Sequence, residues 1–416
     1  MLKTKFIQTK INKTKVAIYP IKGVRTVTIS VLVRAGSWYE KGPNWGAFHL
    51  LEHLVSQGTN EFTTKDKVEL YKEKYGISSD AWTSGKQIGF NLRLPDIHIA
   101  KGLYFLNQIL FHPTIPPKRI PTEISIITQE YQDKWNQPYD KFTQQVNEQL
   151  AGRKHIFTRD ALGQPEYLKS LSRDLLLKLH QQFFQPQNIT IAIAGNIKPS
   201  LVKQELKNLL KQHKNTQTIP ILNPPKIKPK NHLIKYKSHD NQAQILINWF
   251  LPNRKKMSYV DKLTINVANN IIGVGSNSLL SKKIREELGL VYYIKSRLWT
   301  WLDISGLEIQ SSVDTKNINK LIKNAKLIVE EFIDKGISNK KFNQLNKFMD
   351  MRTLMNYDSV DRIAFDLASC LFYYNKVIIP EEQVQKASLI KQKRMIKLLK
   401  NYLKPQKAYI SIMTKD

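Results

Sequence analysis

A stretch rich in proline near the middle of the chain most constrains the fold. Residues 216–232 contain four prolines and show little hydrophobic periodicity. Proline fixes its own backbone φ and restricts the residue before it, so this stretch favours an extended connection over a helix or a strand. A chain of 416 residues is long enough for two domains. We therefore predict an N-terminal domain at 1–215, a linker at 216–232 and a C-terminal domain at 233–416.

Similar series of elements are predicted on the two sides of the linker. The first half has predicted strands at 16–20, 26–33, 79–83, 88–94 and 189–194, and helices at 46–57, 65–75, 96–110, 117–134, 138–151, 172–184 and 198–212. The second half has predicted strands at 244–250, 291–299, 304–311 and 408–413, and helices at 257–272, 277–288, 315–335, 339–355, 358–373 and 382–402. This predicts an α+β protein with two similar sheet-plus-helices domains. The similarity rests on element order, because we see no sequence repeat.

The composition narrows the possible functions. A single cysteine, Cys370, excludes an intrachain disulfide and a cysteine metal cluster. The formal net charge of +31 would attract nucleic acid, anionic membranes or acidic proteins. A plainer interpretation is also open, because the basic residues are spread along the whole chain. No apolar stretch approaches the roughly 20 residues of a membrane helix, and the N-terminus lacks the apolar core of a signal peptide. We expect a soluble, cytoplasmic protein that acts without a membrane.

The segment His49-Leu-Leu-Glu-His53 lies on a predicted helix and is the strongest functional signal. Residues four apart share one helix face, so His49 and His53 can bind one metal ion together. Glu52 flanks the same face, where a carboxylate can take a proton from water. The alternative is an amphipathic helix that carries two surface histidines by coincidence.

A third metal ligand is needed, and two glutamates downstream are candidates. Glu123 and Glu130 are seven residues apart on a predicted helix, so they share a face but are separated by about 10 Å of helix rise. Both are therefore unsuited to bind one ion directly. Spacing alone does not choose between them, and solvent-exposed glutamates are the plainer interpretation.

Together these segments resemble the insulinase/pitrilysin family of zinc metallopeptidases, which includes the mitochondrial processing peptidases. The family pattern is H-x-x-E-H followed by a glutamate ligand after about 76 residues, a position occupied here by Glu130. The resemblance assigns one Zn²⁺ per chain to His49, His53 and Glu130, the general base to Glu52, and a supporting role to Glu123.

The resemblance extends to two further segments. Arg285-Glu-Glu-Leu-Gly-Leu-Val-Tyr292 is similar to the family segment whose arginine and tyrosine hold the substrate and stabilise the oxyanion. The strand residues Asp80, Ala81, Trp82 and Thr83 are similar to the strand that pairs with the substrate. The resemblance thus implies a zinc endopeptidase of unfolded peptides. It also implies a clamshell half that pairs as a homodimer, or as a heterodimer with an inactive paralogue.

Two other functions remain as alternatives. The chain could be a catalytically silent partner or scaffold subunit on the same fold, which zinc content would distinguish. It could also bind nucleic acid through the basic segments at 226–230 and 391–400, although we find no nucleic-acid module and expect no specific nucleic-acid partner.

Overall fold

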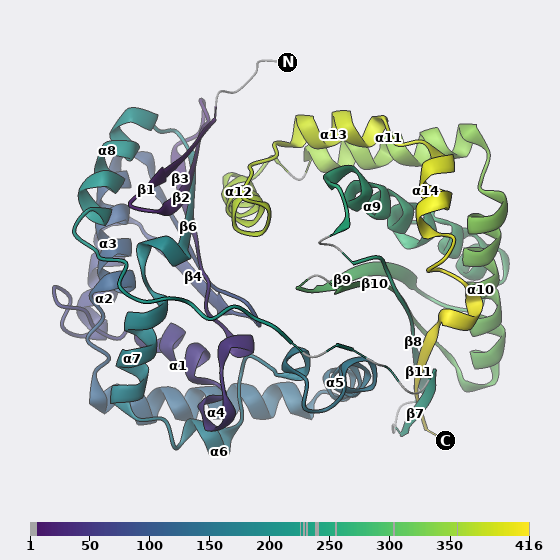
Figure 1. Ribbon diagram of the computed structural model, residues 1–416, viewed down its shortest axis with the longest axis horizontal. Helices are drawn as coiled ribbons and strands as arrows, with labels where there is room; N and C mark the ends of the chain where they lie inside the picture. The colour runs from purple at the N-terminus through teal and green to yellow at the C-terminus, as the bar shows by residue number, and fades with distance from the viewer. Residues whose placement is uncertain are drawn as a thin grey trace. The chain divides into compact units, whose positions relative to one another are not determined.

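The computed structural model describes residues 6–224, 226–227, 229, 232–237, 241–253, 256–302, 304–355 and 357–415 (Figure 1). Its helices and strands form two compact units. Unit 1 consists of Met1–Gln137, His155–Pro225 and Asn356–Ile378, and unit 2 of Pro138–Lys154, Lys226–Met355 and Ile379–Asp416. In the predicted linker, residues 216–224 form neither helix nor strand, and residues 225, 228, 230 and 231 lie outside the described residues.

Unit 1 is built on a six-stranded sheet with the order β1-β2-β6-β3-β5-β4. The strands are β1 (Ile7–Ile11), β2 (Thr14–Pro20), β3 (Thr26–Val33), β4 (Ser78–Thr83), β5 (Ile88–Pro95) and β6 (Ile189–Gly195). Strands β2 and β6 pair in parallel, and the other neighbours are antiparallel. Every residue of β6 is buried, which explains its continuous apolar sequence.

Helices cover both faces of this sheet. They are α1 (Ala47–Leu54), α2 (Lys65–Tyr75), α3 (Ile99–Phe111), α4 (Ile120–Asn136), α6 (Pro165–Leu168), α7 (Arg173–Phe183), α8 (Pro199–Leu210) and α12 (Val360–Tyr374). Figure 1 shows α3 and α8 on one face and α12 on the other. Among the described strands, the edge strand β4 pairs with β5 alone, so one side of its backbone has no partner from them.

Unit 2 repeats this topology. Its sheet has the order β7-β11-β8-β10-β9, with β7 and β11 parallel and the other neighbours antiparallel. These strands are β7 (Leu233–Lys237), β8 (Gln242–Phe250), β9 (Ile294–Trp301), β10 (Ile304–Asp314) and β11 (Tyr409–Thr414). The helices are α5 (Pro138–Ala151), α9 (Tyr259–Gly273), α10 (Ile318–Lys335), α11 (Asn339–Met355), α13 (Pro380–Ser388) and α14 (Gln392–Leu399). The strand order matches β2-β6-β3-β5-β4, so the predicted α+β class with two similar units is confirmed.

The structure also reveals a sequence repeat that element order does not show. The pattern Tyr-x-Ile-x-Ser-x-x-Trp-Thr, followed by a glycine six residues later, occurs at 75–89 and again at 292–306. In each sheet the tryptophan of one strand lies opposite the glycine of the next, as Trp82 opposite Gly89 and Trp299 opposite Gly306. A Cβ atom at either glycine would lie about 2 Å from the indole ring. Glycine is therefore required because the tryptophan ring covers it. The two halves thus share a short sequence repeat, which corrects the expectation that their similarity rests on element order alone.

One helix from each half of the sequence belongs to the other unit. Helix α12 packs on β2, β3 and β6, and its Asp361 accepts hydrogen bonds from Thr28 and Arg93. Helix α5 packs on the sheet of unit 2, where its apolar face contacts Leu246 and Met413. The two helices hold equivalent places, each being the third helix between the last two strands of its half. The units therefore differ from the predicted boundaries here, because an amphipathic pattern does not reveal which sheet will cover it.

Some local predictions need correction. The predicted helix at 277–288 is mainly a π-helix over Ser281–Glu287, and the predicted helix at 382–402 is split into α13 and α14. The split occurs because Lys391 adopts an extended backbone. Strands β1 and β7 were not predicted. Among the described helices, none combines the length and apolar character needed to cross a bilayer.

The tryptophan–glycine pair in unit 2 leads to a stability prediction. Gly306→Ala should lower the free energy of unfolding by about 1–3 kcal/mol, because the added methyl group forces the Trp299 ring out of its place. Ser305→Ala is the matched control on the same strand, since the buried Ser305 hydroxyl has no hydrogen-bond partner among the described residues. Denaturant unfolding of both variants measures the difference, and equal stability would contradict the packing.

Candidate metal centre

Helix α1 presents a polar face because its apolar face is buried. The side chains of Phe48, Leu50, Leu51 and Leu54 are fully buried in the core of unit 1, which fixes the rotation of the helix about its axis. The remaining face carries His49, Glu52 and His53, as their spacing predicted.

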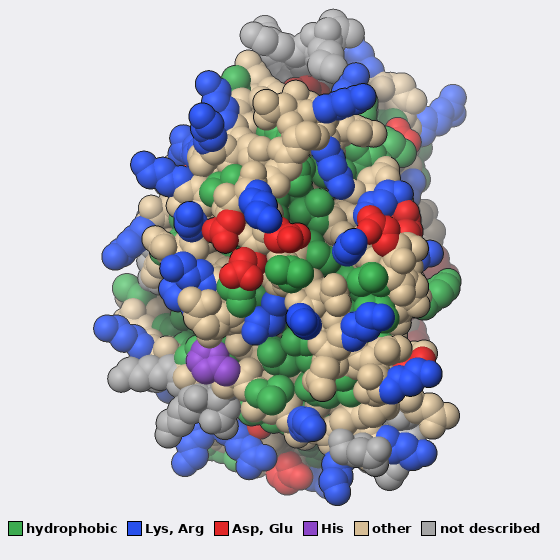
Figure 2. Space-filling model, turned by 90° about the vertical axis from the view of Figure 1, so that its right-hand side faces the viewer, with side chains coloured by type: hydrophobic (Ala, Val, Ile, Leu, Met, Phe, Trp, Pro, Cys, Tyr) green, Lys and Arg blue, Asp and Glu red, His purple; other side chains and the backbone are tan. Residues whose placement is uncertain are grey.

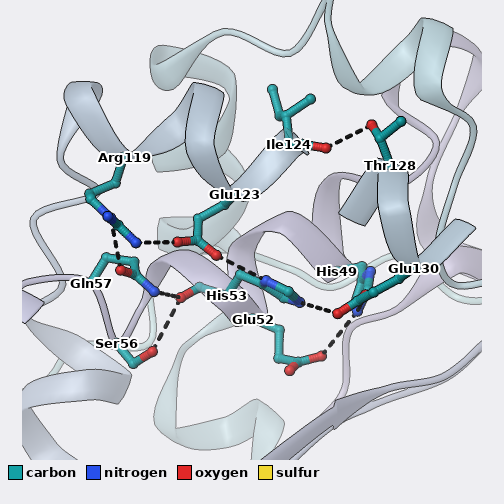
Figure 3. Close-up of polar contacts among 10 residues, drawn as sticks. All are labelled: His49, Glu52, His53, Ser56, Gln57, Arg119, Glu123, Ile124, Thr128 and Glu130. Carbon is teal, nitrogen blue, oxygen red and sulfur yellow. Dashed lines mark hydrogen bonds and ion pairs between the residues drawn. The ribbon is translucent and has the colours of Figure 1, made fainter. Parts of the chain in front are cut away.

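Helix α4 completes the group of candidate ligands. One ligand atom each from His49, His53 and Glu130 lie within 4.8 Å of one another. A carboxylate oxygen of Glu130 is 3.8 Å from His49 Nε2, and its other oxygen is 4.0 Å from His53 Nε2 (Figure 3). Two imidazoles and one carboxylate are a donor set that suits a catalytic zinc site, with a fourth position left for water. Among the described residues, no other group of three His, Cys, Asp or Glu side chains is arranged to hold a metal ion.

Glu123 binds the far side of one imidazole rather than joining the ligands. Its carboxylate lies 3.1 Å from His53 Nδ1, and Arg119 donates to its other oxygen at 2.7 Å. Burial raises the pKa of Glu123, but the hydrogen bonds from His53 and Arg119 outweigh it and lower the pKa below the usual value. A carboxylate that accepts the Nδ1 proton leaves the Nε2 lone pair of His53 for a metal. The spacing argument left Glu123 and Glu130 as alternatives, and this geometry separates their roles.

The two histidines have different environments. Burial lowers the pKa of His49 to about 4, with a smaller contribution from nearby His53. His49 is therefore neutral at physiological pH, which is the form that binds metals. Burial also lowers the pKa of His53, but its hydrogen bond to Glu123 and the surrounding carboxylates outweigh this and raise it. The donor chemistry and the geometry of the chain thus fit a divalent metal ion.

Glu52 is held beside the histidines by the edge strand. Its carboxylate lies 3.9 Å from His49 Nε2 and accepts a 2.7 Å hydrogen bond from the Thr83 hydroxyl at the end of β4. Burial raises the pKa of Glu52, while the Thr83 hydrogen bond lowers it. The predicted substrate contact of Thr83 stays a prediction, and its hydroxyl additionally orients the candidate base.

A buried carboxylate holds the start of α1. The helix begins after Gly46, which has φ +103° and no side chain to cap the first amides. The two oxygens of Glu40 accept hydrogen bonds from the backbone N–H groups of Gly46 and Phe48, both at 2.9 Å. Burial raises the pKa of Glu40 to about 7. Residue spacing did not predict this role of Glu40, because the carboxylate reaches the helix from six residues before Gly46 rather than from the capping position.

The loop that follows α5 in sequence contacts both α4 and the residues at the start of α1. Asp160 pairs with Lys134 of α4, and its backbone carbonyl accepts a 2.6 Å hydrogen bond from the Trp45 indole. Gly163 lies so close to Gly46 that a Cβ atom on Gly163 would be 2.5 Å from the Gly46 Cα. The loop therefore holds the start of the histidine helix near the helix that carries Glu130.

The other predicted site residues lie on the edge strand of unit 1 and in unit 2. Asp80 and Ala81 lie on the edge strand, and Trp82 packs with its ring centroid 5.7 Å from that of Phe365 on α12. Arg285 and Tyr292 belong to unit 2, where the Arg285 guanidinium carbon lies 5.8 Å from the Tyr292 ring centroid. Tyr292 is 85% exposed. Their part in peptide binding stays a prediction.

The capping role of Glu40 can be tested by stability. Glu40→Gln should lower the free energy of unfolding by about 1–3 kcal/mol, because one buried amide of α1 loses its acceptor. The exposed Glu73→Gln on α2 is the control and should change little. Urea unfolding monitored by circular dichroism provides the measurement, and an unchanged midpoint for Glu40→Gln would rule out the cap.

The division of roles between Glu130 and Glu123 predicts a graded loss of metal affinity. Glu123→Gln should weaken zinc binding by about 10–100-fold, as expected for a group that orients a ligand. Glu130→Gln removes a ligand and should weaken it more. Competition with a fluorescent chelator measures both affinities, with Glu73→Gln as the control. A larger loss in Glu123→Gln would reverse the assignment.

Comparison with known proteins agrees with this geometry. Residues 15–158 match the family model described as "Insulinase (Peptidase family M16)", and residues 170–347 match that described as "Peptidase M16 inactive domain". A zinc protease of Rickettsia felis is 24% identical over 91% of this chain and 90% of its own length. The zinc protease YmxG of Bacillus subtilis is 23% identical over 81% of each chain.

Solved structures show the same fold over nearly the whole chain. A structure from Pseudomonas fluorescens titled as a peptidase M16 inactive domain has a TM-score of 0.87 and 15% identity, and covers 99% of this chain and 98% of its own. A protease from Helicobacter pylori has a TM-score of 0.85 and 16% identity, with 99% of both chains covered. The two family models together span most of the chain, and the protein is therefore a member of the insulinase family of peptidases, family M16.

Proposed function

We propose that this protein is a zinc-dependent endopeptidase that binds one Zn²⁺ per chain and hydrolyses extended, unfolded peptides. The observation that carries the proposal is the position of Glu52 beside the group formed by His49, His53 and Glu130. Relatives that match this chain over most of its length are named zinc proteases, which supports the same activity.

The chain's own residues supply positioning and proton transfer. A zinc ion at this site supplies Lewis-acid chemistry that activates water and polarises the scissile carbonyl. The Glu52 carboxylate accepts the proton of the attacking water and then donates it to the leaving amine. The Thr83 hydroxyl, 2.7 Å from Glu52, keeps this carboxylate in one orientation.

The edge strand supports a preference for extended substrates. Strand β4 ends at Thr83, which contacts the candidate base, and has no strand partner on its outer side. A peptide that adds to this edge would form main-chain hydrogen bonds with it, and such pairing depends little on side chains. Folded proteins should be poor substrates, because few present a free extended segment.

The basic composition does not favour a nucleic-acid function. On the face shown in Figure 2, Lys and Arg side chains are scattered among polar and hydrophobic ones and do not form a single patch. This spread fits the even distribution of basic residues along the chain.

Two further expectations rest on the family resemblance. The first is that Arg285 and Tyr292 hold the substrate, which peptide kinetics of Arg285→Ala can test. The second is that the chains pair into dimers, which sedimentation can test.

Peptide hydrolysis tests the proposal directly. A library of quenched fluorescent peptides should be cleaved by the wild-type protein, and Glu52→Gln should lower the rate by about 10²–10⁴-fold with its zinc content unchanged, because it removes only the base. Glu73→Gln, exposed on α2, should keep full activity.

The outcomes separate the proposal from its alternative. Full activity in Glu52→Gln would eliminate Glu52 as the base. A wild-type protein that contains stoichiometric zinc and cleaves no peptide would favour the catalytically silent subunit. A protein that binds no zinc at all would remove the basis of the site.

A further inference from the structure

Unit 2 contains a polar cavity that the proposed peptidase activity does not use. It has a volume of about 260 Å³ and lies between helices α9, α11 and α13. Seven of its eleven lining residues are polar and come from all three helices: Asn266, Asn269, Asn270, Asn346, Asp350, Thr353 and Gln383. The apolar lining residues are Leu263, Val267, Val384 and Ala387. Helix packing normally buries apolar faces, so a group of amide side chains between three helices needs an explanation.

Two of the lining amides are buried and incompletely paired. Asn269 is 9% exposed and Asn346 is 7% exposed, and within the described part of the chain the Oδ1 atom of each has no hydrogen-bond partner. The Asn346 Nδ2 atom donates to the Ala387 carbonyl at 3.3 Å, which determines that the unpaired atom is the oxygen. A buried acceptor without a donor destabilises the folded chain, so such atoms are commonly satisfied by water or a ligand.

Asp350 adds a negative charge to this lining. It is the only charged residue that lines the cavity, and none of the hydrogen bonds or ion pairs described for the chain involves its carboxylate. Burial raises the pKa of Asp350. In a chain with 65 lysines and arginines, a half-buried carboxylate without a basic partner is unexpected.

These unpaired groups all accept hydrogen bonds, so their complement is a cationic donor. We propose that the cavity binds a small organic molecule that carries one primary ammonium group, paired with Asp350, and a second polar group for the asparagines. The cavity is several times the roughly 30 Å³ that one water molecule occupies, so it has room for a chain of several heavy atoms. A bare divalent cation needs oxygen ligands at about 2.0–2.6 Å on all sides and would leave most of this volume unfilled.

The probe that we would use is 4-amino-1-butanol, with 1,4-butanediol as a neutral molecule of the same length. Ligand-observed NMR on the full-length protein should show binding of the amino alcohol with a dissociation constant in the millimolar range or below, and at least tenfold weaker binding of the diol. Zinc content is measured before and after the titration, so that loss of metal to the amine is recognised. Because the readout is binding, the result does not depend on peptidase activity.

Two variants remove the site in different ways. Asp350→Asn keeps the size of the side chain but removes its charge, and should weaken binding of the amino alcohol at least tenfold. Without added ligand its melting temperature should stay equal or rise, since no ion pair or hydrogen bond described for the chain involves the Asp350 carboxylate. Val384→Phe fills the cavity without altering Asp350 and should also abolish binding. Asp334→Asn is the matched control, because Asp334 is 53% exposed on α10 and does not line the cavity.

The possible outcomes are distinct. Binding that is lost in both cavity variants and kept in Asp334→Asn supports the site. The proposal is overturned if the amino alcohol does not bind at about 10 mM, where a ligand of this size should be detectable. It is also overturned if the diol binds equally well or if Asp350→Asn binds unchanged. Binding of Ca²⁺ or Mg²⁺ that excludes the amino alcohol would assign the cavity to an inorganic ion instead.

Discussion

The hydrogen bonds between the buried Glu40 carboxylate and the first amides of α1 are the interaction on which the metal centre depends. Helix α1 has only eight residues, and a helix of this length is unstable in isolation. Its stability therefore comes from its buried apolar face and from the groups that fix its ends. A carboxylate at the N-terminus also interacts favourably with the helix dipole. Small displacements of this helix would move His49, Glu52 and His53 together.

The remaining elements of the centre are positioned relative to α1. Helix α4 brings Glu130 to the histidines and Glu123 to the opposite side of His53, because the two glutamates lie two turns apart. The edge strand β4 contributes Thr83, and the loop containing Asp160 links the two helices. The site thus combines segments spread between Glu40 and Asp160, and each is held by contacts to the others rather than by its local conformation.

The repeated topology of the two halves explains the architecture of the two units and the places where the predicted domain boundaries failed. Both sheets share the order of five strands and the same tryptophan–glycine pair, and among the described residues the candidate metal ligands lie in unit 1. The two units thus present different side chains on a common scaffold. The exchanged helices α5 and α12 tie each unit to the opposite half of the chain, so a boundary drawn at the linker cannot describe either unit completely.

The sequence by itself determined the α+β class, most strands and helices, and the two candidate histidine ligands, whereas residue spacing left Glu123 and Glu130 as alternatives. Hydrophobic periodicity depends on local spacing, and a metal motif depends on residues one helical turn apart, so both are visible in a short segment. Only the tertiary structure decided that Thr83 contacts Glu52 and that Glu40 caps α1. It also decided that α5 packs on the sheet of unit 2 and α12 on the sheet of unit 1. These features are contacts between segments far apart in the chain. An amphipathic pattern specifies that a face is buried, but the partner that buries it is chosen by the packing of the whole fold.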